Sequence, residues 1–97
     1  AASRHVSAVS AFEIANKVRI GKLDAARPAI ETFDIILAEA RFARLDVTQT
    51  HALLAGTLES HHRDPFDRLL AAQAMLEGLI LVTSDKAFAS FGITTIW

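Results

Sequence analysis

Apolar residues recur at helical spacing in four stretches of the chain, and shorter apolar runs lie between these stretches. Spacing of three and four residues predicts amphipathic helices, whereas a short unbroken run such as 79–82 predicts a strand buried on both faces. The predicted elements, in chain order, are a strand over 5–10, helices over 11–20 and 26–44, a strand over 45–47, helices over 49–58 and 65–77, a strand over 79–83, a helix over 86–90 and a strand over 93–97. Strands that alternate with helices indicate an α/β fold with a mostly parallel sheet.

Capping signals mark several predicted helix boundaries. Ser10 and Glu13 have the spacing of a capping box, with the hydroxyl at the N-cap and the carboxylate at the third helical position. Asp64 followed by Pro65 is a strong start signal for a helix, and Gly78 is the expected stop.

The apolar faces also predict which side chains lie in the core. In the helix that Thr48 is expected to cap, the side chains of Ala52, Leu53 and Ala55 are predicted to face inward. Most of the large aromatic side chains are interpreted as core residues, namely Phe12, Phe66, Phe88, Phe91 and Trp97.

The composition narrows the class of protein. Ninety-seven residues suit one domain, because a chain of this length rarely forms two cores. The apolar fraction of 52% favours a sheet buried on both faces or a surface covered by a partner. A net charge of −1 gives no general attraction for nucleic acid, so such binding needs a local patch. The sequence has no cysteine, which excludes disulfides and thiolate metal sites and is compatible with the cytoplasm, and no apolar run reaches the roughly 18–20 residues of a membrane span.

Three acidic residues from separate helix–strand units are expected at one edge of the sheet. Strand carboxyl ends and the N-termini of the helices that follow them share that edge, and Glu13, Asp67 and Asp85 occupy such places. Each also has a local explanation, because a carboxylate at the cap or in the first turn of a helix gains about 0.3–1 kcal/mol from the helix dipole. Asp67 would stand at the third helical position, and Asp85 could cap the short helix after it.

If the three carboxylates lie close together, their mutual repulsion exceeds the stabilisation that the helix dipoles give them. Two carboxylates about 5 Å apart repel by roughly 3 kcal/mol at an effective dielectric constant of about 20. Three of them together need protonation, a basic partner or a hard divalent cation. Ligands that are all oxygen favour Mg²⁺ or Mn²⁺ over Zn²⁺, and such an ion can activate water for attack on a phosphodiester.

Three segments carry a resemblance to a known family: VSAVSAFEIANKVRIGKL (6–23), HRDPFDRLLAAQAMLEGLILVTSDKAF (62–88) and FGITTIW (91–97). They resemble the PIN domain and, within it, the VapC ribonuclease toxins of toxin–antitoxin pairs. The resemblance implies a three-layer α/β/α fold and a Mg²⁺- or Mn²⁺-dependent endoribonuclease that cleaves single-stranded RNA. It also implies a homodimer and a VapB-type antitoxin that occupies the acidic pocket.

The resemblance assigns the chemistry to particular residues. It implies catalytic and metal-binding roles for Glu13, Asp67 and Asp85, with Thr83 and Asp64 as supporting residues.

Several basic residues are candidates for RNA contact, with solvated charges as the alternative: Arg63, Arg68 and Lys86. The histidines have no metal-ligand spacing on a predicted helix and are expected at the surface or in loop packing, with RNA contact as a lesser alternative for His62: His5, His51, His61 and His62.

One departure from the family is plain in the sequence. The family begins with a strand that ends in its first catalytic Asp, followed by a helix, and neither precedes Ala1 here. We therefore expect a fold that lacks its first strand and helix and is unstable alone unless another segment fills the gap. Two other interpretations stay open: a PIN-like protein-binding module with an incomplete acid set, and a fragment whose acids only cap helices.

Overall fold

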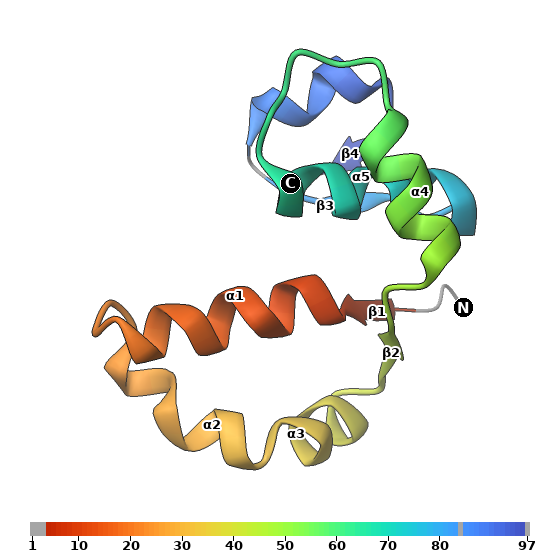
Figure 1. The fold of residues 1–97 in the computed structure, drawn as a ribbon. Helices are drawn as coiled ribbons and strands as arrows, with labels where there is room; N and C mark the ends of the chain where they lie inside the picture. The colour runs from red at the N-terminus through yellow and green to blue at the C-terminus, as the bar shows by residue number, and fades with distance from the viewer. Residues whose placement is uncertain (1–3, 84, 97) are drawn as a thin grey trace. The chain divides into compact units, whose positions relative to one another are not determined.

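The computed structural model describes residues 4–83 and 85–96. The chain divides into two compact units, Ala1–Asp46 and Val47–Trp97, and each unit contains one pair of parallel strands (Figure 1). The predicted α/β class with parallel strand pairing is confirmed.

In the first unit the chain leaves one strand, passes through helices and returns to pair with that strand. Its elements are β1 (Arg4–Ser7), α1 (Ala8–Arg19), the 3₁₀ helix η1 (Asp24–Ala26), α2 (Arg27–Glu31), α3 (Phe33–Glu39) and β2 (Phe42–Leu45). β1 and β2 are parallel, with Ser7 opposite Leu45, and Figure 1 shows the return path from α1 to β2. Val9, Val18 and Leu37 supply the buried apolar side chains of this unit.

The start of α1 differs from the prediction. The Ser7 hydroxyl accepts a hydrogen bond from the Val9 amide at 3.0 Å, so Ser7 rather than Ser10 is the N-cap and β1 ends there. Either serine hydroxyl can cap a helix. Ser7 is the one that does so, which makes α1 longer than predicted. Glu13 therefore lies in the second turn of α1, not at the third helical position, and the first turn contains no acidic residue.

The helix predicted over 26–44 is not continuous. Its apolar spacing is right for α3, but the chain turns at Thr32, between α2 and α3, and again at Arg41, where φ is +60°. A left-handed residue cannot continue an α-helix, so the chain leaves the helical path and β2 begins at Phe42. The strand predicted over 45–47 is therefore placed too late.

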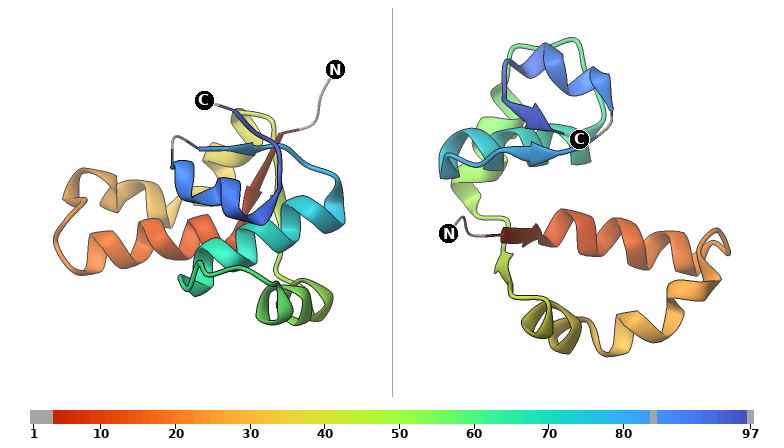
Figure 2. Two further views of the ribbon diagram at one scale, coloured as in Figure 1. Left: turned by 90° about the horizontal axis from the view of Figure 1, so that it is seen from above. Right: turned by 180° about the vertical axis from the view of Figure 1, so that it is seen from behind.

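The second unit contains two packed helices and a short parallel strand pair. Its elements are α4 (Gln49–Thr57), α5 (Pro65–Glu77), β3 (Leu81–Val82), the 3₁₀ helix η2 (Lys86–Phe91) and β4 (Thr95–Ile96). α4 packs against α5, and η2 connects β3 to β4 (Figure 2). The predicted boundaries at Thr48, Asp64 and Gly78 are confirmed by the observed caps.

The core of this unit joins α5 to η2. Ala71, Phe88 and Phe91 are buried together, and four partly buried side chains pack on them: Leu58, Leu70, Leu81 and Ile93. The prediction that Phe88 and Phe91 are core residues is confirmed.

Other core predictions are wrong. Phe12 is exposed, and Val82 is 63% exposed, so the run over 79–83 is a shorter strand that is not buried on both faces. Phe66 is partly buried, and Trp97 lies outside the described residues.

α4 turns a different face inward from the one predicted. Leu53 is 63% exposed, and Ala52 is exposed as well, whereas Ala55 is buried as expected. The remaining inward position belongs to His51, which is 2% exposed and lies within a helix, whereas the sequence predicted a place at the surface or in loop packing.

Polar partners explain why His51 is buried. Its Nδ1 accepts a hydrogen bond from the Thr48 amide at 3.0 Å, and its Nε2 lies 3.0 Å from Glu77 Oε2 in α5. A histidine with both nitrogens bonded can be buried at little cost.

Candidate functional site

The first turn of α5 fixes the position of Asp67. The Asp64 carboxylate accepts hydrogen bonds from the amides of Phe66, at 2.9 Å, and Asp67, at 3.3 Å. Pro65 occupies the first helical position, where its missing N–H costs nothing. Asp64 is thus the predicted N-cap, and Asp67 stands at the third helical position as expected.

The Asp67 side chain has a partner that the sequence did not predict. His62 Nε2 lies 2.7 Å from Asp67 Oδ2, and the two side chains are 18% and 20% exposed. The contact joins the loop before α5 to the helix itself. In the sequence, His62 and Asp67 are simply a histidine and an aspartate five positions apart, on either side of the Asp64 cap. That pattern is too weak to predict a contact.

The ring of His62 also packs on the core of the second unit. It stacks on Phe88 with ring centroids 6.1 Å apart and meets Phe91 edge-on at 5.3 Å. Aromatic pairs at such separations contribute beyond their buried area. His62 therefore has the packing role expected of a loop histidine, together with its bond to Asp67.

Asp85 follows β3 and begins η2. Its Oδ1 accepts a hydrogen bond from the Ala87 amide at 2.9 Å, so its capping role is real. The Thr83 hydroxyl accepts a hydrogen bond from the Asp85 amide at 3.1 Å, and the Thr83 amide donates to the Ile96 carbonyl at 3.0 Å. Thr83 thus ties the backbone of Asp85 to the β3–β4 pair.

Direct contacts connect the surroundings of Asp67 and Asp85. Asp67 is bonded to His62, His62 stacks on Phe88, and Phe88 lies in the 3₁₀ helix that Asp85 caps. The hydroxyls of Ser60 and Ser90 add a second link between the same loop and helix, at 3.1 Å. These contacts join the loop before α5 to the 3₁₀ helix that Asp85 caps.

Glu13 belongs to the first unit, where it lies partly buried in α1. The convergence of Glu13 with Asp67 and Asp85 stays a prediction.

The carboxylate oxygens of Asp67 and Asp85 are ligands of the kind that a hard cation prefers. Within the described residues, no three His, Cys, Asp or Glu side chains group as a metal site. Mg²⁺, however, is commonly held by one or two carboxylates together with water and substrate phosphates. Within the described chain, Asp67 is hydrogen-bonded through Oδ2 and Asp85 through Oδ1. The other oxygen of each carboxylate accepts no hydrogen bond from the described residues.

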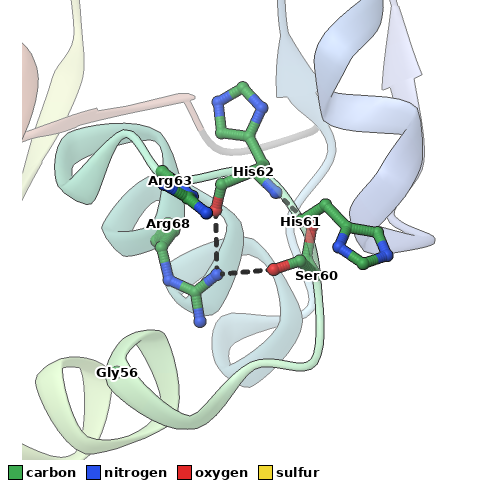
Figure 3. Close-up of a pocket in the computed structure, with 6 residues that line it drawn as sticks. All are labelled: Gly56, Ser60, His61, His62, Arg63 and Arg68. Atoms are coloured by element: carbon green, nitrogen blue, oxygen red, sulfur yellow. Dashed lines mark hydrogen bonds between the residues drawn. The ribbon is translucent and has the colours of Figure 1, made fainter.

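A pocket of about 450 Å³ lies beside this region, and none of the described residues that line it is acidic. Its lining residues are Gly56, Ser60, His61, His62, Arg63 and Arg68 (Figure 3). In Figure 3 the Arg68 guanidinium is directed at the loop, whereas the ring of His61 points away from this guanidinium. Arg63 and His61 are exposed, and Lys86 is exposed at the start of η2.

Arg68 holds the loop that forms this pocket. Its guanidinium donates to carbonyls at the end of α4 and in the loop, namely those of Ala55 at 2.9 Å, Leu58 at 2.6 Å, Ser60 at 3.4 Å and His62 at 2.9 Å. The last carbonyls of a helix have no partner within it, so a basic side chain from a neighbouring helix can satisfy them.

The model of the PIN domain family matches residues 1–93, which spans both units. The chain belongs to the PIN domain family. PIN domains are generally nucleases that require divalent metal ions, which agrees with the oxygen-only donors at Asp67 and Asp85. No curated protein matches the sequence. Each helix of the described chain is too short or too polar to cross a lipid bilayer.

Proposed function

We propose that this PIN domain is a metal-dependent endoribonuclease of the VapC type. The observation that supports the proposal is that Asp67 is bonded to His62, whose ring stacks on Phe88 of the helix that Asp85 caps, in a chain that the PIN family spans almost completely. Glu13, Asp67 and Asp85 are the proposed ligands of Mg²⁺ or Mn²⁺. Such an ion supplies Lewis acidity, lowers the pKa of water and neutralises charge at the phosphate.

The residues of the chain have separate proposed tasks. Asp64 and Thr83 hold the backbones of Asp67 and Asp85, so they support the acidic residues without touching substrate. Arg63 is the best-supported RNA contact, because it is exposed in the basic pocket, while the guanidinium of Arg68 is engaged with carbonyls. Lys86, next to Asp85, is a second proposed contact for the RNA backbone.

We further propose a VapB-type antitoxin and a second copy of this chain as partners, in the cytoplasm. Exposed large apolar side chains such as Ile35, Leu53 and Ile80 support such contacts. A guanidinium from the antitoxin could neutralise the acidic residues in place of the metal, which would inhibit cleavage.

The test is cleavage of single-stranded RNA with Mg²⁺ or Mn²⁺ by the protein and by Asp67→Asn. Replacing one ligand by a neutral amide should lower the rate at least about 100-fold, since a metal ligand and its charge are lost. Glu39→Gln, which removes an exposed carboxylate at the end of α3, should keep the original rate.

EDTA should abolish the cleavage by the unaltered protein. Equal and EDTA-insensitive cleavage by the protein and Asp67→Asn would reject the mechanism. Absence of both cleavage and Mn²⁺ binding would favour the protein-binding module instead.

A further inference from the structure

His62 is held in place from several sides. Its amide donates to the Ser60 hydroxyl at 3.1 Å, and its carbonyl accepts from Arg68 at 2.9 Å. Its ring packs against the side chains of Phe88 and Phe91, which also contact each other, with ring centroids 6.0 Å apart. A side chain with both its backbone and its ring fixed loses little further freedom when it makes a hydrogen bond.

An ionised carboxylate only accepts hydrogen bonds. With Asp67 in that form, His62 Nε2 is the donor to Asp67 Oδ2 at 2.7 Å. The donor engages one oxygen, and within the described chain Asp67 Oδ1 accepts no hydrogen bond.

The backbone and the side chain of Asp67 are therefore fixed by different groups. Its backbone amide is held by the Asp64 cap, and its Oδ2 is held by His62, so the carboxylate has little freedom to rotate. Preorganised ligands bind a metal more tightly, because the cost of ordering them has already been met.

We propose that His62 is a positioning residue, which orients the Asp67 carboxylate through Oδ2 and leaves Oδ1 for the divalent cation. This inference rests on the proposed function, because it takes Asp67 as a metal ligand. The role differs from charge neutralisation, since a single donor at one oxygen leaves the second oxygen for a cation.

The test separates the hydrogen bond of His62 from its packing. His62→Phe keeps a ring against Phe88 and Phe91 but removes the donor, and His62→Gln restores an amide donor near the place of Nε2. Mn²⁺ affinity is measured by isothermal titration for each variant, and folding is checked by circular dichroism and thermal unfolding. We expect His62→Phe to weaken Mn²⁺ binding about 10–100-fold and His62→Gln to recover most of the loss.

Phe91→Leu is the matched control for packing. It loosens the contact with the ring of His62 but leaves the donor and Asp67 unchanged, so it should lower the melting temperature without a comparable loss of Mn²⁺ affinity. Equal weakening by Phe91→Leu and His62→Phe would overturn the positioning role in favour of a purely structural one. If His62→Phe does not fold, the comparison of His62→Gln with the shorter His62→Asn decides, because only Gln is expected to reach Asp67.

The outcomes distinguish this inference from the proposed function. If His62→Phe binds Mn²⁺ as the unaltered protein does, while Asp67→Asn does not bind, the positioning role is wrong and the metal site stands. If the unaltered protein does not bind Mn²⁺ at millimolar concentration, both the metal site and the positioning role are wrong.

Discussion

Arg63 and Arg68 line the same pocket, but their structural situations are opposite. Arg63 is exposed, whereas Arg68 donates to four backbone carbonyls. We expect Arg68→Ala to lower the free energy of unfolding by about 2–4 kcal/mol, because the end of α4 and the loop lose their shared donor. Urea unfolding monitored by circular dichroism measures the change.

Arg63→Ala is the matched control, since it removes the same charge from the same pocket. It should change the free energy of unfolding by less than about 0.5 kcal/mol. Its effect is expected on RNA binding instead, as a weaker affinity and a smaller dependence on salt concentration. Equal destabilisation by the two substitutions would contradict the structural role of Arg68.

At the scale of single residues, the sequence predicted contacts made within a few positions and missed those made across the fold. Asp64 and Gly78 were predicted correctly because a cap depends on its immediate neighbours. His51 was wrongly expected at the surface or in loop packing, because its partner Glu77 is 26 positions away. The pair of His62 and Asp67 was missed because two other aromatic residues position the ring.

The ends of the helices show how local chemistry determines the elements. Gly78 ends α5 with φ of 65°, a left-handed conformation that a side chain disfavours. An added Cβ at Gly78 would meet no atom within 4 Å, so only the backbone conformation opposes it. We expect Gly78→Ala to destabilise the protein by about 1–2 kcal/mol in thermal or urea unfolding.

Gly56 offers the same substitution with the opposite expected sign. It lies within α4 without a positive φ, and an added Cβ there also meets open space. Gly56→Ala should therefore stabilise the protein by about 0.5–1 kcal/mol, because the unfolded chain loses freedom. A loss of stability in both variants would show that the conformation of Gly78 is not the cause.

The prediction of α5 was right because boundary signals at both ends accompanied its apolar pattern. α5 has an Asp–Pro start and a Gly stop, and its observed bounds match the predicted ones. The stretch over 26–44 had helical spacing but no glycine or proline at the places where it breaks. The turns at Thr32 and Arg41 use residues that give no such signal, so the pattern merged separate elements into one helix.

At the scale of the whole molecule, the family match includes both units, although each unit has its own pair of strands. A cation bound only by the folded chain stabilises it by mass action, by about 2.7 kcal/mol at a concentration 100 times Kd. We expect Mn²⁺ to raise the melting temperature of the unaltered protein and EDTA to reverse the rise. Asp67→Asn and Glu13→Gln should show a smaller rise, which differential scanning fluorimetry would measure.

A matched rise in Asp67→Asn would mean that Mn²⁺ binds elsewhere. Because the readout is stability rather than turnover, it also tests Glu13 without any assumption about the RNA target. The α/β class could be predicted from the sequence, whereas the meeting of Glu13, Asp67 and Asp85 depends on long-range packing and stays a prediction.

The hydrogen bond between Thr83 and β4 connects the last strand to the backbone of Asp85. The amide of Thr83 donates to Ile96, and its hydroxyl in turn anchors the amide of Asp85. Trimming by a protease within 94–96, or a bulky affinity tag fused there, would reach a proposed catalytic acid through two hydrogen bonds. Tags for biochemical work should therefore be kept away from β4.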